Sequence, residues 1–426
     1  MADAPAEVLE SGPGRPGRLG RPGRWRRPWA LLLVLAAAAA LVGLRAAQTG
    51  GRAGPQPVAG AAGSAAEPEP SVVFVPGPSS DRQTCTGACR EGRFRVAARP
   101  GYGPAGVRLV AGGAEPVLLD LGTGRTTPIP GLPLRADRTA TLYQVPGGLV
   151  GTVSVAGGGP VGSYLLRGSA PAVRLGTFDG VIPSRDGGFY AFDMGWNPPR
   201  PGRLVAFTGT GRPRWQRPFR QPTAVLRDTR HGLLIHQVPD PASGAGPVLL
   251  ADPRTGVPRH EIGWAQQVLA STDRYVVWLD GACTDDGAPC ELLVTDLTGP
   301  HTTSYPVPLG RVPSTAAVSP DGRVAVGVGG LPGFVPGQVR DGFVALLDRS
   351  TGAFTRLPGL STQVKHVPAV GWSPDGGWLL IAVQPDDEHD RLVLRRPGRS
   401  GLTMLPTVLP AWSLDTGNGL LIQAGE

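Results

Sequence analysis

A repeat with a period in the forties runs through most of the chain and limits what it can fold into. Aspartates in turn-like contexts recur at spacings of 49, 42, 45, 48, 54 and 40 residues. The best copies are the Ser-Pro-Asp-Gly segments at 319–322 and 373–376. Asp and Gly adopt turn conformations at low steric cost, so we expect these aspartates to be structural turn residues. The full set is Asp137, Asp186, Asp228, Asp273, Asp321, Asp375 and Asp415.

An apolar run that leads into a glycine recurs in step with the aspartates. Clear copies are Leu204–Phe207 before Gly211 and Val344–Leu347 before Gly352. A β-like run lies between each aspartate and its glycine. We therefore expect each repeat to form four strands. An Asp-Gly turn joins the first two strands, a loop joins the second to the third, and a Thr-Gly turn joins the last two. Short strands at this period are typical of a β-propeller blade.

The repeats predict an all-β fold, namely a β-propeller of seven blades over residues 100–426. The last repeat ends with Leu420–Gln423 and lacks outer strands, whereas the first glycine landmark lacks a preceding aspartate. The two halves are expected to complete one blade and so join the ends of the ring. Val107–Val110 is one strand more than seven blades need, which leaves six and eight blades as alternatives.

The two Ser-Pro-Asp-Gly segments resemble the blade motif of TolB-like and WD-repeat-like propellers, over roughly residues 100–426. Such families mostly act as protein-interaction platforms, so the resemblance implies a binding role. A weaker resemblance links Leu204–Phe207, Thr210-Gly211 and Trp215 to a blade of quinoprotein-like propellers. That resemblance implies the alternative, an enzyme of quinoprotein-like or lyase-like type that uses the central channel.

Composition narrows the fold and the partners. The chain has 64 Gly and 47 Pro among 426 residues, and in a helix interior each Gly costs about 1 kcal/mol and each Pro about 3 kcal/mol. This excludes a long helical bundle. The net charge of +8 raises the question of a nucleic-acid partner. However, residues 1–52 hold eight arginines against Asp3, Glu7 and Glu10, so much of the excess lies outside the repeats, and we expect no nucleic-acid partner.

The N-terminal region predicts the topology. Residues 1–27 are rich in Gly, Pro and Arg, which predicts a disordered basic tail. Residues 28–44 carry no charge and predict a transmembrane signal anchor; a cleaved signal peptide is the alternative. Six arginines precede this span, so the positive-inside rule puts the tail in the cytoplasm and the other end outside. The Ala/Gly/Pro-rich stretch 45–99 is expected to be a linker.

The four cysteines are expected to form two disulfides outside the membrane. Local pairing of Cys85 with Cys89 and of Cys283 with Cys290 fits the spacing best. A four-thiolate zinc site is the alternative, but its usual two-residue knuckles are absent from the sequence.

The sequence contains no constellation that predicts catalysis. The six histidines are scattered, and there is no Gly-x-Ser-x-Gly elbow, phosphate loop or dinucleotide fingerprint. The acidic run 386–390 is expected to be a solvated loop. We therefore predict no catalytic, cofactor-binding or metal-binding residues and no cofactor.

Together these patterns predict a single-pass protein of a bacterial plasma membrane, held by residues 28–44, with an extracytoplasmic propeller. The propeller is expected to be a non-enzymatic scaffold that binds another protein or a cell-wall glycan. The enzyme alternative predicts a convergent His/Arg/Glu set at the channel mouth, whereas a bare, apolar or Asp/Ser channel favours the scaffold. The sequence leaves the oligomeric state open.

Overall fold

The structure is a computed structural model, and all the residues that it describes belong to one compact unit, Pro68–Glu426. These residues are 72–74, 95–155, 158–194, 202–238, 245–280, 290–299, 301–307, 312–329, 343–361, 368–383, 389–399, 401–410, 413–414 and 420–424. The predicted tail and signal anchor lie outside them, as do Cys85, Cys89, Cys283 and Asp415. Within the described ranges, no helix has the length and apolar character needed to span a membrane.

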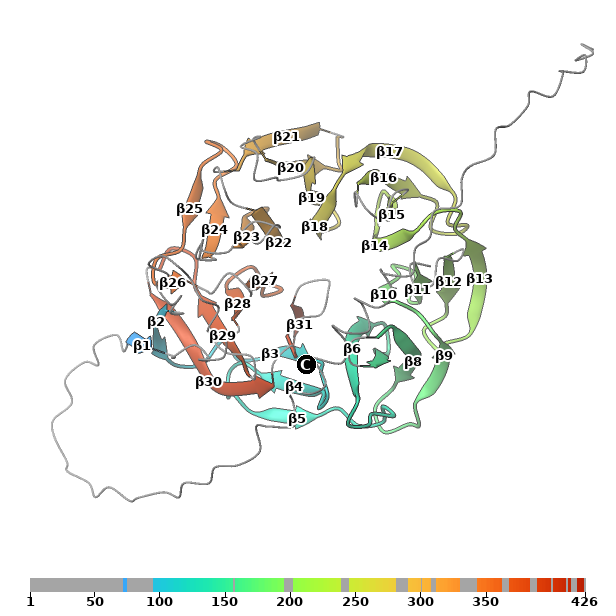
Figure 1. The fold of residues 1–426 in the computed structure, drawn as a ribbon, viewed down its shortest axis with the longest axis horizontal. Coiled ribbons are helices and arrows are strands. Elements are labelled where there is room, and N and C mark those ends of the chain that lie inside the picture. The colour runs from blue at the N-terminus through green and yellow to red at the C-terminus, as the bar shows by residue number, and fades with distance from the viewer. Residues whose placement is uncertain are drawn as a thin grey trace, which may run out of the picture. The chain divides into compact units, whose positions relative to one another are not determined.

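Seven four-stranded antiparallel blades follow one another around a ring in this unit (Figure 1). The predicted all-β propeller of seven blades is therefore confirmed. In blades 2 to 6 the four strands are consecutive in sequence and run from the centre of the ring outward.

The strands of blades 2 to 6 have the following bounds. Blade 2 contains β6 (Arg138–Val145), β7 (Gly148–Val155), β8 (Pro160–Leu166) and β9 (Val173–Gly176). Blade 3 contains β10 (Gly180–Pro183), β11 (Phe189–Asp193), β12 (Arg203–Phe207) and β13 (Pro213–Pro218). Blade 4 contains β14 (Thr223–Thr229), β15 (Gly232–Gln237), β16 (Gly246–Ala251) and β17 (Pro258–Ala265). Blade 5 contains β18 (Gln267–Ser271), β19 (Tyr275–Asp280), β20 (Glu291–Asp296) and β21 (His301–Pro306). Blade 6 contains β22 (Val312–Val318), β23 (Val324–Gly329), β24 (Phe343–Leu347) and β25 (Phe354–Arg356).

Blade 1 closes the ring with strands from both ends of the propeller. Its innermost strand is the C-terminal β31 (Leu421–Ala424), which pairs with β3 (Val107–Ala111). The outer strands are β4 (Val117–Asp120) and β5 (Thr126–Pro128). The two predicted half-repeats thus complete one blade. The strand that seemed surplus, β3, is the second strand of this blade, so the number of blades stays at seven.

Blade 7 carries additional strands on its outer edge. It contains β27 (Ala369–Trp372), β28 (Leu379–Val383), β29 (His389–Arg395) and β30 (Leu402–Pro410). The strand β2 (Arg95–Pro100) pairs parallel with β30, and both β1 (Val72–Phe74) and β26 (Leu360–Ser361) pair with β2. Two strands therefore lie in the stretch predicted as a linker. The buried side chains of Val96 and Ala98 alternate along β2 and pack into the core of blades 6 and 7.

The hydrophobic core lies between the blades. Each pair of neighbouring blades shares a cluster of buried apolar side chains. One such cluster joins Tyr190 and Phe192 of blade 3 to Leu233 and Ile235 of blade 4. The stabilisation that such a cluster gives is roughly proportional to the apolar area that it removes from water. Apolar packing between the faces of neighbouring blades therefore contributes most to holding the ring together.

Two kinds of short turn share one face of the propeller. Because antiparallel strands alternate in direction, the turn between the first and second strands lies on the same face as the turn between the third and fourth. We call these the inner turn and the outer turn, and their common side the turn face. The predicted glycine landmarks Gly211 and Gly352 lie in outer turns and adopt positive φ values of 82° and 75°. In the outer turn of blade 7, Gly398 has a positive φ of 75°.

Candidate functional site

The repeat aspartates lie in different places relative to the inner turns. Asp186, Asp273, Asp321 and Asp375 lie between the first and second strands of blades 3, 5, 6 and 7. Asp228 lies within β14, and Asp137 precedes β6 instead of following it. The residue type that the inner turns of blades 3 to 7 share is a hydroxyl residue at the end of the first strand or just after it. These hydroxyl residues are Ser184, Thr229, Thr272, Ser319 and Ser373.

In blades 6 and 7 the aspartate is bound within its own turn. Ser319 Oγ donates to Asp321, and Ser373 Oγ donates to Asp375 Oδ1 at 2.5 Å. The serine hydrogen bond is the largest cause that lowers the pKa of each carboxyl below its usual value. Each serine oxygen also accepts the backbone N–H of the residue just before the second strand. These two aspartates are therefore structural parts of closed turns.

In blade 4 the aspartate binds the preceding blade. Asp228 is 7% exposed, and its Oδ2 accepts Ser184 Oγ at 3.0 Å and the backbone N–H of Arg185 at 2.9 Å. Burial raises the pKa of Asp228, although the hydrogen bonds from Arg185 and Ser184 oppose this effect. This carboxylate therefore connects the inner turn of blade 3 to the inner strand of blade 4.

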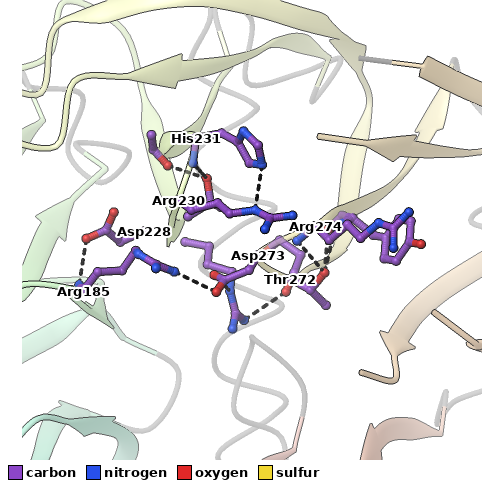
Figure 2. A network of polar contacts seen from close by, with 12 residues as sticks. Arg185, Asp228, Arg230, His231, Thr272, Asp273 and Arg274 are labelled. Carbon is purple, nitrogen blue, oxygen red and sulfur yellow. Dashed lines mark hydrogen bonds and ion pairs between the residues drawn. The ribbon is translucent and has the colours of Figure 1, made fainter. Parts of the chain in front are cut away.

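In blade 5 the carboxylate of Asp273 meets arginines from two other blades. Arg185 Nη1 of blade 3 lies 2.7 Å from Asp273 Oδ2, and Figure 2 shows this contact beside Thr272. Arg227 Nε of blade 4 lies 3.6 Å from Asp273 Oδ1. Arg227 Nη1 also donates to the Ser271 carbonyl at 3.1 Å. Side chains from three consecutive blades thus meet at one carboxylate.

Two further arginines flank this contact. Arg230 Nε donates to His231 Nε2 at 3.1 Å, as Figure 2 shows. Arg274 lies over the ring of Tyr275 at 5.0 Å and pairs with Asp296 at 2.9 Å. Burial opposes the shift, but the hydrogen bonds from Arg274 and Thr298 lower the pKa of Asp296 to about 2. We call Arg185, Arg227, Arg230 and Asp273 the inner-rim cluster.

The chemistry of the inner-rim cluster is that of charge recognition. Guanidinium groups stay protonated at physiological pH, donate several hydrogen bonds in a planar fork and bind carboxylates and phosphates. The imidazole of His231 already accepts a hydrogen bond from Arg230. The guanidiniums of this set can therefore bind an oxyanion.

The remaining predicted residues lie elsewhere. Cys290 is buried and disulfide-bonded, and since the other three cysteines are outside the described ranges, the pairing stays a prediction. Asp390, from the acidic run, is buried and accepts the backbone N–H of Leu414 at 2.9 Å. His236 is buried against the Ala265 carbonyl, and burial lowers its pKa. No group of three or more His, Cys, Asp or Glu among the described residues is placed to hold a metal ion.

The sequence pattern did not predict the inner-rim cluster, because Asp228 and Asp273 fit the same period as the turn aspartates. The hydroxyl residues give the signal that separates them. Asp321 lies two residues after its hydroxyl residue, Asp273 lies one residue after Thr272, and Asp228 lies one residue before Thr229. Only the first spacing lets the carboxylate bind within its own turn.

Comparisons with known proteins give only distant likenesses. No family model matches the chain, and no curated protein matches it. A periplasmic gluconolactonase from Pseudomonas aeruginosa is 14% identical with a TM-score of 0.48, over 75% of this chain and 99% of that one. TolB from Acinetobacter baumannii is 13% identical with a TM-score of 0.38, over 74% and 64%. Prolyl oligopeptidase B from Galerina marginata is 13% identical with a TM-score of 0.47, over 70% and 48%.

The present chain thus spans about half the length of the prolyl oligopeptidase and about two thirds of TolB. Likenesses at this level carry no information on activity. The closed ring of seven four-stranded blades is itself a β-propeller fold.

Proposed function

We propose that the chain is a non-enzymatic binding scaffold whose turn face holds a partner protein. The observation that carries this proposal is the inner-rim cluster, in which arginines from two blades meet one carboxylate of a third. These side chains come from strand ends and short turns of a packed ring. They are therefore held in place before any partner arrives, and such preorganisation lowers the entropy that binding would cost.

The turn face offers further contact groups around the cluster. Arg323 of blade 6 lies over the ring of Trp372 of blade 7 at 4.7 Å and donates to the Gly376 carbonyl at 2.8 Å. Arg349 lies over Tyr275 at 4.5 Å. Both rings are buried, so the groups that a partner can contact here are the guanidiniums. Arginine is among the residue types enriched at energetically important contacts between proteins. The composition of this face therefore supports a protein partner over a cell-wall glycan, which remains the other ligand to test.

The location is part of the proposal. The sequence of residues 1–52 supports a signal anchor that holds the propeller outside a bacterial plasma membrane, with the tail in the cytoplasm. A scaffold at that position would meet partners of the cell envelope. N-terminal sequencing of the mature protein tests this part separately, because a start near Gln48 would mean that the signal is cleaved.

A channel-based enzyme is the second candidate, and one observation bears on it. Arginines meet near the inner turns, as the enzyme alternative requires, but their acidic partner is Asp273 instead of a glutamate. Among the described residues, His231 lies beside them and accepts a hydrogen bond from Arg230. A visible absorption spectrum of the purified full-length protein tests the quinoprotein-like version. A bound chromophore would favour the enzyme.

Photo-crosslinking tests the scaffold. A photoreactive residue replaces Arg212 or Arg254, which are exposed in outer turns on the turn face, in the full-length protein in its own membrane. Matched controls carry the same residue at Val173 or Trp264, which are exposed on the outer strands β9 and β17. We expect the two turn-face positions to capture the same partner and the control positions not to capture it. Capture from the outer strands alone, or from no position, would overturn the proposal.

A further inference from the structure

Asp273 differs from the other turn aspartates in what binds its carboxylate. In blades 6 and 7 the carboxylates of Asp321 and Asp375 accept hydrogen bonds from the serines of their own turns. In blade 5 the hydroxyl of Thr272 accepts the backbone N–H groups of Arg274 and Tyr275 at 3.2 and 2.8 Å. The turn is closed without its carboxylate, which is therefore available to the arginines.

The two arginines are positioned by contacts that do not involve Asp273. The backbone N–H of Arg185 donates to the buried Asp228, and Arg227 Nη1 donates to the Ser271 carbonyl. Each guanidinium then meets a different oxygen of Asp273, with Arg185 at Oδ2 and Arg227 at Oδ1. The arrangement matches a planar carboxylate that bridges two forks.

The bridging carboxylate is easily exchanged. The side chains of Arg185, Arg227 and Asp273 are 49%, 46% and 50% exposed. Ion pairs with this exposure change an equilibrium constant by only about fivefold or less, because water and salt compete for them. A carboxylate of a partner can therefore replace Asp273 at the two arginines with only a small cost in free energy.

The surrounding charges leave the cluster positive. Asp186 pairs with Arg214, and Arg274 pairs with Asp296, so these neighbours are balanced. The carboxylate of Asp228 is buried beneath the turns and faces the backbone of Arg185. Arg230 meets only the imidazole of His231 among the described residues. Its terminal nitrogens are a further set of donors beside the bridged pair.

We propose that Arg185, Arg227 and Arg230 form a recognition site for carboxylates of an acidic peptide segment on a partner protein, and that Asp273 occupies this site in the free protein. The inference rests on the proposed function, in which the turn face holds a partner protein. Beyond the proposed function, it specifies that the partner presents carboxylates and that Asp273 of the chain itself competes with them. A carboxylate is favoured over a phosphate because a carboxylate already bridges the two guanidiniums.

A labelled hexaglutamate peptide tests the proposal in fluorescence anisotropy with the full-length protein in detergent, at low salt. Asp273→Asn removes the internal competitor, and we expect it to tighten binding about fivefold. Arg185→Gln and Arg227→Gln each remove a charged donor from a half-exposed site, and we expect about fivefold weaker binding. The matched control is Asp375→Asn, which removes the same charge from the same face but from a closed turn whose carboxylate accepts hydrogen bonds from Ser373 and the backbone of Gly377. It should change affinity less than twofold.

Three results would overturn the inference. Equal effects of Asp273→Asn and Asp375→Asn would mean that only the overall charge matters. No loss in Arg185→Gln and Arg227→Gln would place the peptide elsewhere. Binding of inorganic polyphosphate but not hexaglutamate would make the site one for phosphate.

The crosslinking experiment distinguishes a failure of the carboxylate proposal from a failure of the proposed scaffold function. If the turn-face crosslinks of the wild-type protein persist while hexaglutamate does not bind, only the carboxylate proposal fails. If no turn-face position captures a partner, the proposed function fails as well. If both hold, Arg227→Gln should reduce crosslinking from position 254, and unchanged crosslinking there would again count against the carboxylate site.

Discussion

Two pairs of blades close their inner turns in different ways, blades 6 and 7 in one way and blades 4 and 5 in another. In blades 6 and 7 a serine and an aspartate bind each other within one turn. In blades 4 and 5 a threonine closes the turn alone, and the aspartate reaches another blade. A hydroxyl residue is thus sufficient to close the turn, which leaves the aspartate free for contacts between blades.

The two aspartates that leave their turns also differ from each other. Asp228 is buried and connects blades 3 and 4, whereas Asp273 is half-exposed and meets arginines of blades 3 and 4. Burial makes the loss of a hydrogen-bond acceptor expensive, and exposure makes an ion pair weak. We therefore expect Asp228 to contribute to stability and Asp273 to contribute to binding.

The largest effect is expected for Asp228→Ala. This change leaves the buried hydroxyl of Ser184 and the backbone N–H of Arg185 without their acceptor, which should cost about 2–3 kcal/mol. The measurement is urea or thermal unfolding of the full-length protein followed by circular dichroism. Asp186→Ala is the matched control, since Asp186 is exposed and pairs with Arg214 on the surface. It should cost about 1 kcal/mol or less, and equal losses would contradict the distinction between buried and exposed aspartates.

A smaller effect is expected for Ser373→Ala in a closed turn. Ser373 is 1% exposed, and its oxygen accepts the Trp378 N–H at 2.9 Å while its hydroxyl donates to Asp375. The loss should be about 1 kcal/mol in the same unfolding experiment. Ser350→Ala removes an exposed hydroxyl that donates to Asp348 at 2.7 Å and should cost less than about 0.5 kcal/mol. A loss at Ser350 as large as that at Ser373 would show that burial of the hydroxyl is not what matters.

The pH dependence should have opposite signs in the two kinds of turn. The folded pKa of Asp375 is lowered by the hydrogen bond from Ser373, so its contribution to stability is present above the unfolded value of 3.8 and is lost as the pH falls through the folded pKa. Burial raises the pKa of Asp228, so stability relative to Asp228→Asn should improve as the pH falls toward 3.8. Thermal midpoints of the wild-type protein, Asp375→Asn and Asp228→Asn between pH 7 and pH 3 test both signs. Parallel curves for the two variants would contradict the assignment.

The sequence predicted the ring well and the inner-rim cluster poorly, and the reason is physical. Strand periodicity and turn glycines are local properties, so the aspartate series was enough to predict seven blades and their closure. The contact of Arg185 with Asp273 joins residues that are 88 positions apart, and it depends on which way a turn carboxylate points. A shift of one residue relative to Thr272 changes that direction, while the repeat period hardly changes.

Pairing of β2 with blade 7 could not be read from the sequence for a similar reason. Its buried side chains, Val96 and Ala98, form a very short alternation in a stretch rich in Ala, Gly and Pro. The strand is stabilised by an existing edge on β30, with Ala98 opposite Leu402. The residue pattern of 95–100 alone therefore does not indicate that this segment pairs with β30.

The smallest effect on stability is expected for Asp273→Asn. Its turn is closed by Thr272, and its ion pairs are half-exposed, so the change should alter the free energy of unfolding by about 0.5 kcal/mol or less. Thr272→Ala is the matched variant one residue away, and it should cost about 1 kcal/mol, because two backbone N–H groups lose their acceptor. If Asp273→Asn proves the more destabilising of the two, the carboxylate holds blades 3, 4 and 5 together. It could then not be released to a partner at low cost, and the difference between Asp228 and Asp273 would be one of degree.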